Sequence, residues 1–272
     1  MFTVRIVTLA MLALTAALTG FAAPLAQHVV VIGVDGMTAK SVEAAQTPNI
    51  HALMKSGAYT LTAHAVRPTV SSPNWASMLM GSEPKTHGVH DNDWQPDKEH
   101  RFPTIFTALR AANPDAVIVS AYEWLDFRRL YDSKEVTKQA SCLKGLMQGD
   151  TSEYGPARSV ASQAAELIET LKPQLTFIHL DLVDHAGHKN IYDSPKYNET
   201  VGEADRLVGQ IVRAVDAAGI RDTTAIFVVS DHGGKNDGHG GDSPEETIVP
   251  WMVAGAGVVP GATSRTEPSG SV

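Results

Sequence analysis

The segment Thr224–Val229 constrains the fold most, because it is an unbroken run of apolar and β-branched residues. Such a run is typical of a strand buried on both faces, as in a parallel sheet covered by helices. The sequence Ser-Asp-His-Gly-Gly follows at once, so Asp231 and His232 stand just past the end of this strand. Ligands bind at that edge of open α/β sheets. A single Asp-His pair is also consistent with an ordinary polar loop, so the other strand ends matter.

Two further apolar runs deliver acidic and imidazole groups in the same way. Residues 27–34 form a β-branched segment that reaches Asp35, and residues 175–180 form another that is followed by Asp184 and His188. Segments with helical patterns lie between these runs. Strands that alternate with helices indicate an α/β protein with three α/β/α layers and a mostly parallel central sheet. Parallel strands end at one edge, so we expect these side chains to lie close together.

A hydroxyl-rich stretch precedes a helix that we predict to begin near Pro73 and to end at Gly81. Proline is favoured at the first helical position, and glycine commonly ends a helix. Hydroxyl groups lie just ahead of this helix on Thr69, Ser71 and Ser72, and Ser72 is the expected N-cap. Because the first N–H groups of a helix are free and its dipole is positive there, this stretch is a candidate anion site.

Length and composition favour one large folded domain. With 272 residues, of which 43% are hydrophobic, the chain can bury a substantial core. The formal net charge of -8 and the absence of Lys/Arg runs argue against a nucleic-acid-binding surface. Cys142 is the single cysteine, so no internal disulfide can form, and we expect it to be a buried apolar residue.

The first residues have the layout of a secretory signal peptide. Arg5 precedes a mostly apolar run at 6–18, and small residues follow this run. We predict a signal peptide at 1–22, cleaved after Ala22, with Ala26 as the alternative cleavage position. An uncleaved membrane anchor is the rival interpretation, but Thr and Gly residues dilute a span that is already short.

Signal cleavage would send the protein to a bacterial periplasm or out of the cell, with no stable membrane span remaining. We assign residues 23–256 to one folded domain. Within it, 122–155 is polar and irregular, which favours a small insertion or cap over the sheet. Residues 257–272 are rich in Gly, Pro and Ser, which is typical of a disordered tail.

Together these residues resemble the alkaline phosphatase superfamily, and most closely its type I phosphodiesterase/nucleotide pyrophosphatase family. The pieces that carry the resemblance occur in the family's order, at 33–36, 68–74 with 81 and 87–88, 184–188, and 230–233 with 239–240. They extend over nearly the whole predicted domain. The resemblance implies an alkaline phosphatase-like metallohydrolase domain whose site holds two divalent metal ions, usually zinc.

The resemblance also implies a role for each candidate residue. One ion would be held by Asp35, Asp231, His232 and the oxygen of the nucleophile, and the other by Asp184, His188 and His239. The family has a Thr or Ser two residues before Pro-Asn, so Ser71 would be the nucleophile and would also contact the first ion. Asn74 would donate a hydrogen bond to a phosphoryl oxygen.

The chemistry of these side chains agrees with such a site. Carboxylate oxygens and imidazole nitrogens suit Zn²⁺ and are acceptable to Mn²⁺. Two ions ~4 Å apart can lower the pKa of a bound hydroxyl and stabilise both the entering and the leaving oxygen of a displacement. His185, beside Asp184, is the competing ligand, whereas His179, in mid-strand, is expected to be a hydrogen-bonded core residue.

The sequence departs from the resemblance at positions that bear on the substrate. Nucleotide-cleaving members carry an aromatic residue after the nucleophile, where this chain has Ser72, and sulfatases need Arg where it has Trp75. Residues 72–81 hold no Arg that could clamp a phosphate dianion. We therefore predict an exported two-metal hydrolase that cleaves phosphodiester or pyrophosphate bonds of small molecules through a covalent phosphoserine. A phosphomonoesterase and a non-catalytic metal-binding domain are the alternatives.

Overall fold

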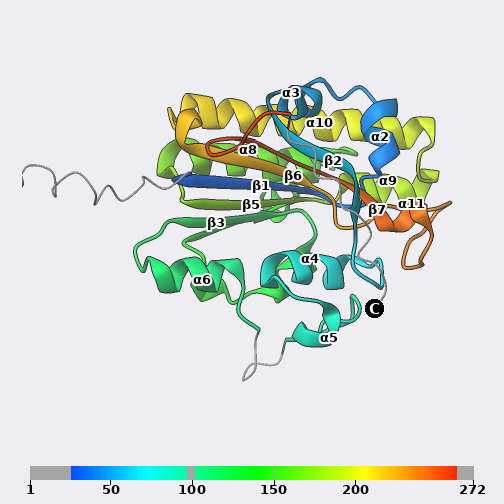
Figure 1. Ribbon diagram of the computed structural model, residues 1–272, viewed down its shortest axis with the longest axis horizontal. Coiled ribbons are helices and arrows are strands. Elements are labelled where there is room, and N and C mark those ends of the chain that lie inside the picture. Colours follow the sequence, from blue (N-terminus) through cyan, green and yellow to red (C-terminus); the bar gives the residue numbers. More distant parts are fainter. Residues whose placement is uncertain (1–25, 97–101, 150, 262–272) are drawn as a thin grey trace, which may run out of the picture.

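The computed structural model describes residues 26–96, 102–149 and 151–261. Within these residues the chain forms one seven-stranded sheet in the order β2-β7-β6-β1-β5-β3-β4. The strands are β1 (His28–Val34), β2 (Gly57–His64), β3 (Ile118–Tyr122), β4 (Lys138–Ser141), β5 (Leu175–Leu180), β6 (Thr224–Val229) and β7 (Ile248–Gly255). Helices lie on both faces of the sheet, which confirms the predicted three-layer α/β/α arrangement (Figure 1).

The α-helices of the described residues are α2 (Ala39–Ala44), α3 (Pro48–Ser56), α4 (Ser71–Met80), α5 (Pro84–His87), α6 (Ile105–Ala112), α7 (Leu143–Met147), α8 (Gly155–Leu171), α9 (Leu182–Asn190), α10 (Pro195–Ala217) and α11 (Pro244–Thr247). Short 3₁₀ segments are η1 (Leu125–Leu130), η2 (Ser133–Glu135) and η3 (Arg221–Thr223). Helices α3, α8 and α10 cover one face of the sheet, and α4 and α6 cover the other (Figure 1).

Strand pairing brings three strand ends to one edge. β1 pairs in parallel with both β5 and β6, and β3 continues the parallel pairing with β5 and β4. β7 runs antiparallel to β6 and to β2, so the sheet is mostly parallel, as predicted. Gly33 of β1 lies level with His179 of β5 and with Val229 of β6. The residues that follow these three positions therefore leave the sheet side by side.

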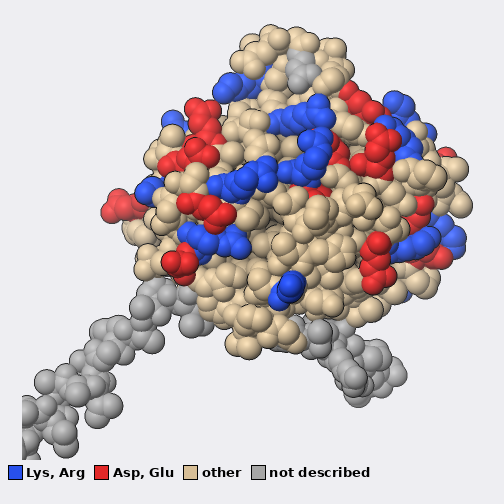
Figure 2. All heavy atoms as spheres, turned by 90° about the horizontal axis from the view of Figure 1, so that it is seen from above, with Lys and Arg blue, Asp and Glu red and all other residues tan. Residues whose placement is uncertain are grey.

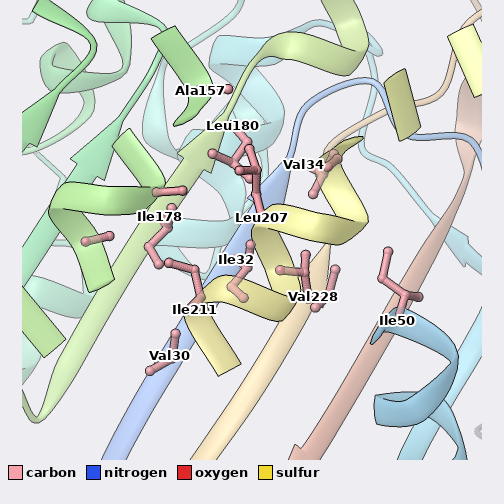
Figure 3. Close-up of a cluster of buried hydrophobic side chains, with 14 of the residues drawn as sticks. Val30, Ile32, Val34, Ile50, Ala157, Ile178, Leu180, Leu207, Ile211 and Val228 are labelled. Carbon is pink, nitrogen blue, oxygen red and sulfur yellow. The ribbon is translucent and has the colours of Figure 1, made fainter. Parts of the chain in front are cut away.

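The central strand β1 is buried on both faces. The cluster drawn in Figure 3 includes Val30, Ile32 and Val34 of β1 with Leu207 and Ile211 of α10. The alternate residues Val29 and Val31 pack toward the opposite face, against a second cluster that contains Trp75 and Phe177. Burying each Val, Leu or Ile side chain stabilises the fold by roughly 1.5–3 kcal/mol. The packing on both faces of β1 therefore fixes the position at which this strand ends.

Part of the segment 122–155 differs from the irregular cap that we expected. β4 pairs in parallel with β3, with Lys138 opposite Val119, and so extends the edge of the sheet. The strand is short and its first residues, Lys138 and Gln139, are exposed, because one edge of β4 has no neighbouring strand among the described residues. A strand of this kind lacks the apolar run by which the buried strands were found.

The helix of the hydroxyl-rich stretch begins earlier than predicted. α4 starts at Ser71, and Val70 occupies the N-cap position without a side-chain hydrogen bond, so the expected cap at Ser72 is wrong. The N–H group of Ser72 instead donates to Asn92 Oδ1 at 2.9 Å. A side chain from a later loop thus provides the acceptor that a local cap would have provided.

The surface viewed in Figure 2 mixes both signs of charge, with Lys and Arg side chains interspersed with Asp and Glu. An ion pair between a half-exposed Arg158 and a buried Glu203 joins α8 to α10, with Nε 2.8 Å from Oε1. Among the described residues, no helix combines the length and the apolar character needed to cross a bilayer. The predicted signal peptide at 1–22 lies outside the described residues, as does most of the predicted tail at 257–272. Of that tail 257–261 is described, and there the N–H of Gly261 donates to Gly57 O at 2.9 Å.

Candidate metal centre

The edge where β1, β5 and β6 end carries the two predicted groups of metal-ligand side chains. The first donor group consists of Asp35, Asp231 and His232, and the second of Asp184, His188 and His239. Asp35 follows β1 directly, the pair at 231–232 follows β6, and α9, which begins just after β5, carries the ligands at 184 and 188. The structure therefore brings together all six predicted ligand side chains, although they are spread over about two hundred residues of the sequence.

The first donor group is buried and lies beside Ser71. His232 Nε2 stands 3.4 Å from Asp35 Oδ1 and 3.3 Å from Asp231 Oδ2. Ser71 Oγ, on the first residue of α4, stands 3.2 Å from the same nitrogen. Donor atoms around one tetrahedral ion with bonds of about 2.0–2.1 Å are about 3.3 Å apart, so the spacing suits zinc.

Two carboxylate oxygens of this group need a positive charge near them. Asp35 Oδ1 and Asp231 Oδ2 are buried and have no hydrogen-bond partner among the described residues. A buried anionic oxygen without a partner is costly. Burial and the neighbouring Asp231 raise the pKa of Asp35 well above its usual range, and burial raises the pKa of Asp231 as well. A divalent cation between these atoms would remove the cost, so the residues fit the ion that the resemblance implies.

The three histidines of the two groups are oriented by the main chain. Nδ1 lies 2.8 Å from Gly233 O in His232, 2.7 Å from Asp237 O in His188 and 2.8 Å from Thr69 O in His239. A carbonyl can only accept, so Nδ1 must carry the proton and donate it. Nε2 of each neutral ring then keeps a lone pair, and this is the atom that faces the donor group.

The second donor group is more open to solvent. His188 Nε2 lies 3.3 Å from Asp184 Oδ2 and 3.2 Å from His239 Nε2, while His239 Nε2 lies 3.6 Å from Asp184 Oδ1. The side chain of His188 is 45% exposed, whereas His232 in the first group is fully buried. Asp184 and His188 are one helical turn apart on α9, which places both side chains on the same face of that helix.

Comparison with known proteins identifies the family. The model of the type I phosphodiesterase/nucleotide pyrophosphatase family matches residues 29–237, a range that contains five of the six ligands and Ser71. The chain belongs to this family. Ectonucleotide pyrophosphatase/phosphodiesterase 1 of Saccharomyces cerevisiae is 24% identical over 247 residues, which cover 75% of this chain and 33% of the yeast protein. The chain spans less than half the length of the curated relatives that it matches.

Solved structures share the fold of this family member. Murine ectonucleotide pyrophosphatase/phosphodiesterase 5 superposes with a TM-score of 0.60 at 19% identity, covering 76% of this chain and 57% of the murine chain. A protein of the alkaline phosphatase superfamily from Vibrio parahaemolyticus gives a TM-score of 0.68 at 16% identity, covering 88% of this chain and 62% of the other. At these identities the likeness concerns the fold alone.

Among the hydroxyls of the family's nucleophile stretch, the structure separates Ser71 from Thr69. The Thr69 hydroxyl donates to Gly241 O at 2.8 Å and accepts from the N–H of Gly240 at 3.0 Å. Its carbonyl also accepts from His239. Thr69 therefore ties the nucleophile stretch to the loop that carries His239, whereas the Ser71 hydroxyl faces the first donor group.

Asn74 does not point its amide at the donor groups. Its Nδ2 donates to Pro68 O and to Val70 O, both at 2.9 Å, and its Oδ1 accepts from the N–H of Val66 at 2.8 Å. Both amide hydrogens are thus used within the loop, so the expected contact with a phosphoryl oxygen is not prepared in this structure. Asn74 shapes the turn that leads into Ser71 instead.

The sequence did not predict the hydrogen bonds that hold Asp35. Trp75 Nε1 donates to Asp35 Oδ2 at 2.8 Å, and His179 Nε2 lies 3.0 Å from the same oxygen. His179 is therefore a buried hydrogen-bonded residue, as expected, and Asp181 lies close enough to it and to Asp35 to form a third donor cluster. The signals available in the sequence were the position of Trp75 one helical turn after Ser71 and that of His179 near the end of β5.

His185, the competing ligand, lies elsewhere. Its exposed side chain lines a cavity of about 240 Å³ together with Glu123 and Cys142, and none of the six donor residues lines this cavity. Glu123 Oε2 accepts hydrogen bonds from the N–H groups of Asp181 at 2.7 Å and Leu182 at 3.1 Å, at the start of α9. This contact holds the helix that carries Asp184 and His188.

Proposed function

We propose that this protein hydrolyses phosphodiester or pyrophosphate bonds of small molecules, with two divalent ions, zinc in the first instance, and with Ser71 as the nucleophile. The observation that carries the proposal is the position of Ser71 Oγ, 3.2 Å from His232 Nε2 and beside the unpartnered oxygens of Asp35 and Asp231. A hydroxyl that a metal ion coordinates becomes a stronger nucleophile, and Ser71 Oγ lies where such coordination would occur.

The ions would lower the pKa of the Ser71 hydroxyl and neutralise negative charge on the substrate's phosphoryl oxygens. Ser71 Oγ attacks phosphorus and loses its proton, while the bond from phosphorus to the leaving oxygen breaks and that oxygen takes up a proton. Water then attacks the phosphoserine, which releases the phosphoryl product and restores the hydroxyl. The N–H groups at the start of α4 add little to this, because that of Ser72 donates to Asn92 Oδ1, that of Asn74 donates to Val70 O, and Pro73 has none.

The residues of α4 favour a diester over a monoester. Between Ser71 and Met80 this helix contains neither Lys nor Arg. A monoester carries one more negative charge than a diester and benefits from a bidentate arginine, which α4 does not offer. Ser72, buried behind the nucleophile, cannot stack on a nucleobase, so we propose no preference for nucleotides.

We also propose that the protein is exported, to a bacterial periplasm or the medium. The support is the signal-like sequence at 1–22 together with the relatives, which are named ectonucleotide enzymes.

The proposal is tested with protein stripped by a chelator and then reloaded with zinc. We expect two ions per chain, no hydrolysis of bis(4-nitrophenyl) phosphate after stripping, and recovery on reloading. The matched monoester, 4-nitrophenyl phosphate, should be cleaved more slowly.

The other outcomes separate the alternatives. Faster cleavage of the monoester would identify a phosphomonoesterase. Two bound ions without turnover of either ester or of a dinucleotide pyrophosphate would identify a non-catalytic metal-binding domain. Full activity of the stripped protein would contradict the two-ion mechanism itself.

A further inference from the structure

The two oxygens of Asp184 have different neighbours. Oδ2 lies 3.3 Å from His188 Nε2 in the second donor group, whereas Oδ1 accepts a hydrogen bond from the hydroxyl of Tyr192 and lies farther, 3.6 Å, from His239 Nε2. Tyr192 follows the end of α9 and is almost completely buried. A carboxylate that is held by one oxygen cannot rotate freely, so its other oxygen keeps a fixed direction.

Space for the Tyr192 ring is left by two glycines on different elements. A Cβ atom on Gly187 of α9, or on Gly234 in the loop after β6, would lie less than 3.0 Å from atoms of the ring. Any other residue at either position would collide with it. Glycine in the middle of a helix weakens the helix, so its presence at 187 is explained by the room that the ring needs.

The backbone around Tyr192 is strained and firmly held. Ile191 and Asp193, on either side of it, have positive φ angles of 70° and 59°, which are unfavourable for residues other than glycine and most of all for a β-branched one. The N–H of Tyr192 donates to Asn236 O at 2.7 Å, and Asp193 Oδ1 accepts from the Thr38 hydroxyl at 2.7 Å. Strain that surrounding contacts maintain is typical of functional sites.

The first donor group is built in the same way. Oδ1 of Asp35 belongs to the donor group, and Oδ2 accepts a hydrogen bond from the indole N–H of Trp75. A Cβ atom on Gly33 would collide with the Trp75 ring. Each donor group therefore contains a carboxylate whose second oxygen is held by an aromatic donor, and each aromatic ring lies against glycine.

We propose that Tyr192 is a positioning residue for the second metal site. Its hydroxyl holds Asp184 so that Oδ2 faces the ion shared with His188 and His239. The inference rests on the proposed two-ion function, and it concerns the affinity of one site and not the chemical step. Without the hydroxyl, Asp184 can rotate away from the ion, so the second site weakens while the first does not.

The test is a zinc titration of metal-free protein in competition with a chelating indicator. We expect Tyr192→Phe to weaken one of two binding steps by about 10- to 100-fold, the usual effect of removing such a partner, and to leave the other step unchanged. In a His188→Ala background, which already lacks the second site, the same substitution should change nothing further. Tyr122→Phe is the matched control, since its hydroxyl donates to Gln139 Oε1 at 3.2 Å, outside both donor groups.

Three outcomes would count against the inference. Wild-type protein that binds fewer than two ions overturns the two-ion function, and the role of Tyr192 with it. Two tight ions in the wild type with unchanged affinities in Tyr192→Phe overturn the role of Tyr192 alone. Equal weakening of both sites, with a metal-free melting temperature well below that of Tyr122→Phe, shows a general effect on folding and also overturns it.

Discussion

Each imidazole of the two donor groups gives its Nδ1 proton to a main-chain carbonyl, and the three carbonyls belong to Gly233, Asp237 and Thr69. The tautomer of every ring is therefore set by the backbone before an ion arrives. Two of these carbonyls lie in the loop after β6, so that loop orients ligands on α9 as well as its own. The orientation of the three imidazole ligands therefore depends on hydrogen bonds to the main chain.

Ser71→Ala removes the attacking oxygen and leaves all six donor side chains in place. We expect diester hydrolysis to fall by about 10³-fold or more, because nothing else in the first donor group can form the covalent intermediate. Zinc content, measured by mass spectrometry of the native protein, should stay near two ions per chain. Thr69→Ala should retain the covalent intermediate, so loss of turnover in that variant with normal turnover in Ser71→Ala would contradict the assignment.

At the scale of single elements, α9 connects the metal centre to a neighbouring carboxyl group. Glu123, just past β3, accepts two hydrogen bonds from the first N–H groups of α9. Burial nevertheless raises the pKa of Glu123 to about 7, from an ordinary value of 4.5. The folded protein therefore binds a proton more tightly than the unfolded chain does, and this favours the folded state most at low pH.

The stability that this proton provides is fully present below pH 4.5 and is lost as the pH rises through 7. We expect the free energy of unfolding of the zinc-loaded wild type to fall, relative to Glu123→Gln, by up to about 1.4 kcal/mol per pH unit between pH 5 and 7. Urea unfolding at several pH values measures the difference. Glu153→Gln, at the rim of the same cavity, should follow the wild type. Parallel curves for wild type and Glu123→Gln would show that Glu123 does not carry this proton.

The sequence predicted elements better than it predicted contacts between them. The apolar runs of β1, β5 and β6 identified buried strands, and parallel strands must end at one edge, so the convergence of Asp35, Asp184 and Asp231 could be foreseen. Tyr192 and Glu123 could not, because each meets its partner only through the register of packed elements. β4 was missed because an exposed edge strand needs no apolar run.

For the whole molecule, the order of the strands explains how ligand residues that are far apart in the sequence come together. β1, β5 and β6 are neighbours in the sheet, although β5 and β6 follow β1 by more than a hundred residues. On the other side of β6 the sheet continues with β7, which pairs antiparallel with both β6 and β2. The segments between these strands mostly return over the faces as helices, so the donor groups lie at the edge where the strands end.

Export is a property of the whole chain and is tested on it. Expressed in a bacterium, the full chain should appear in the periplasmic fraction or the medium, and its first residue should be Ala23, because small residues precede the predicted cleavage position. Leu14→Lys interrupts the apolar run and should keep the protein in the cytoplasm with an intact amino terminus. A wild-type protein that remains cytoplasmic and begins at Met1 would exclude a cleaved signal.

The unequal exposure of the two donor groups has a consequence for metal exchange. His232 is sealed from solvent, whereas nearly half of the His188 side chain is open to it. A competing chelator could approach an ion in the second group directly, but it would reach one in the first group only after the surrounding structure opens. The two ions would therefore differ in their rates of dissociation even at equal affinity. The ion in the first group would exchange slowly, and the ion in the second group would exchange readily with metal in solution.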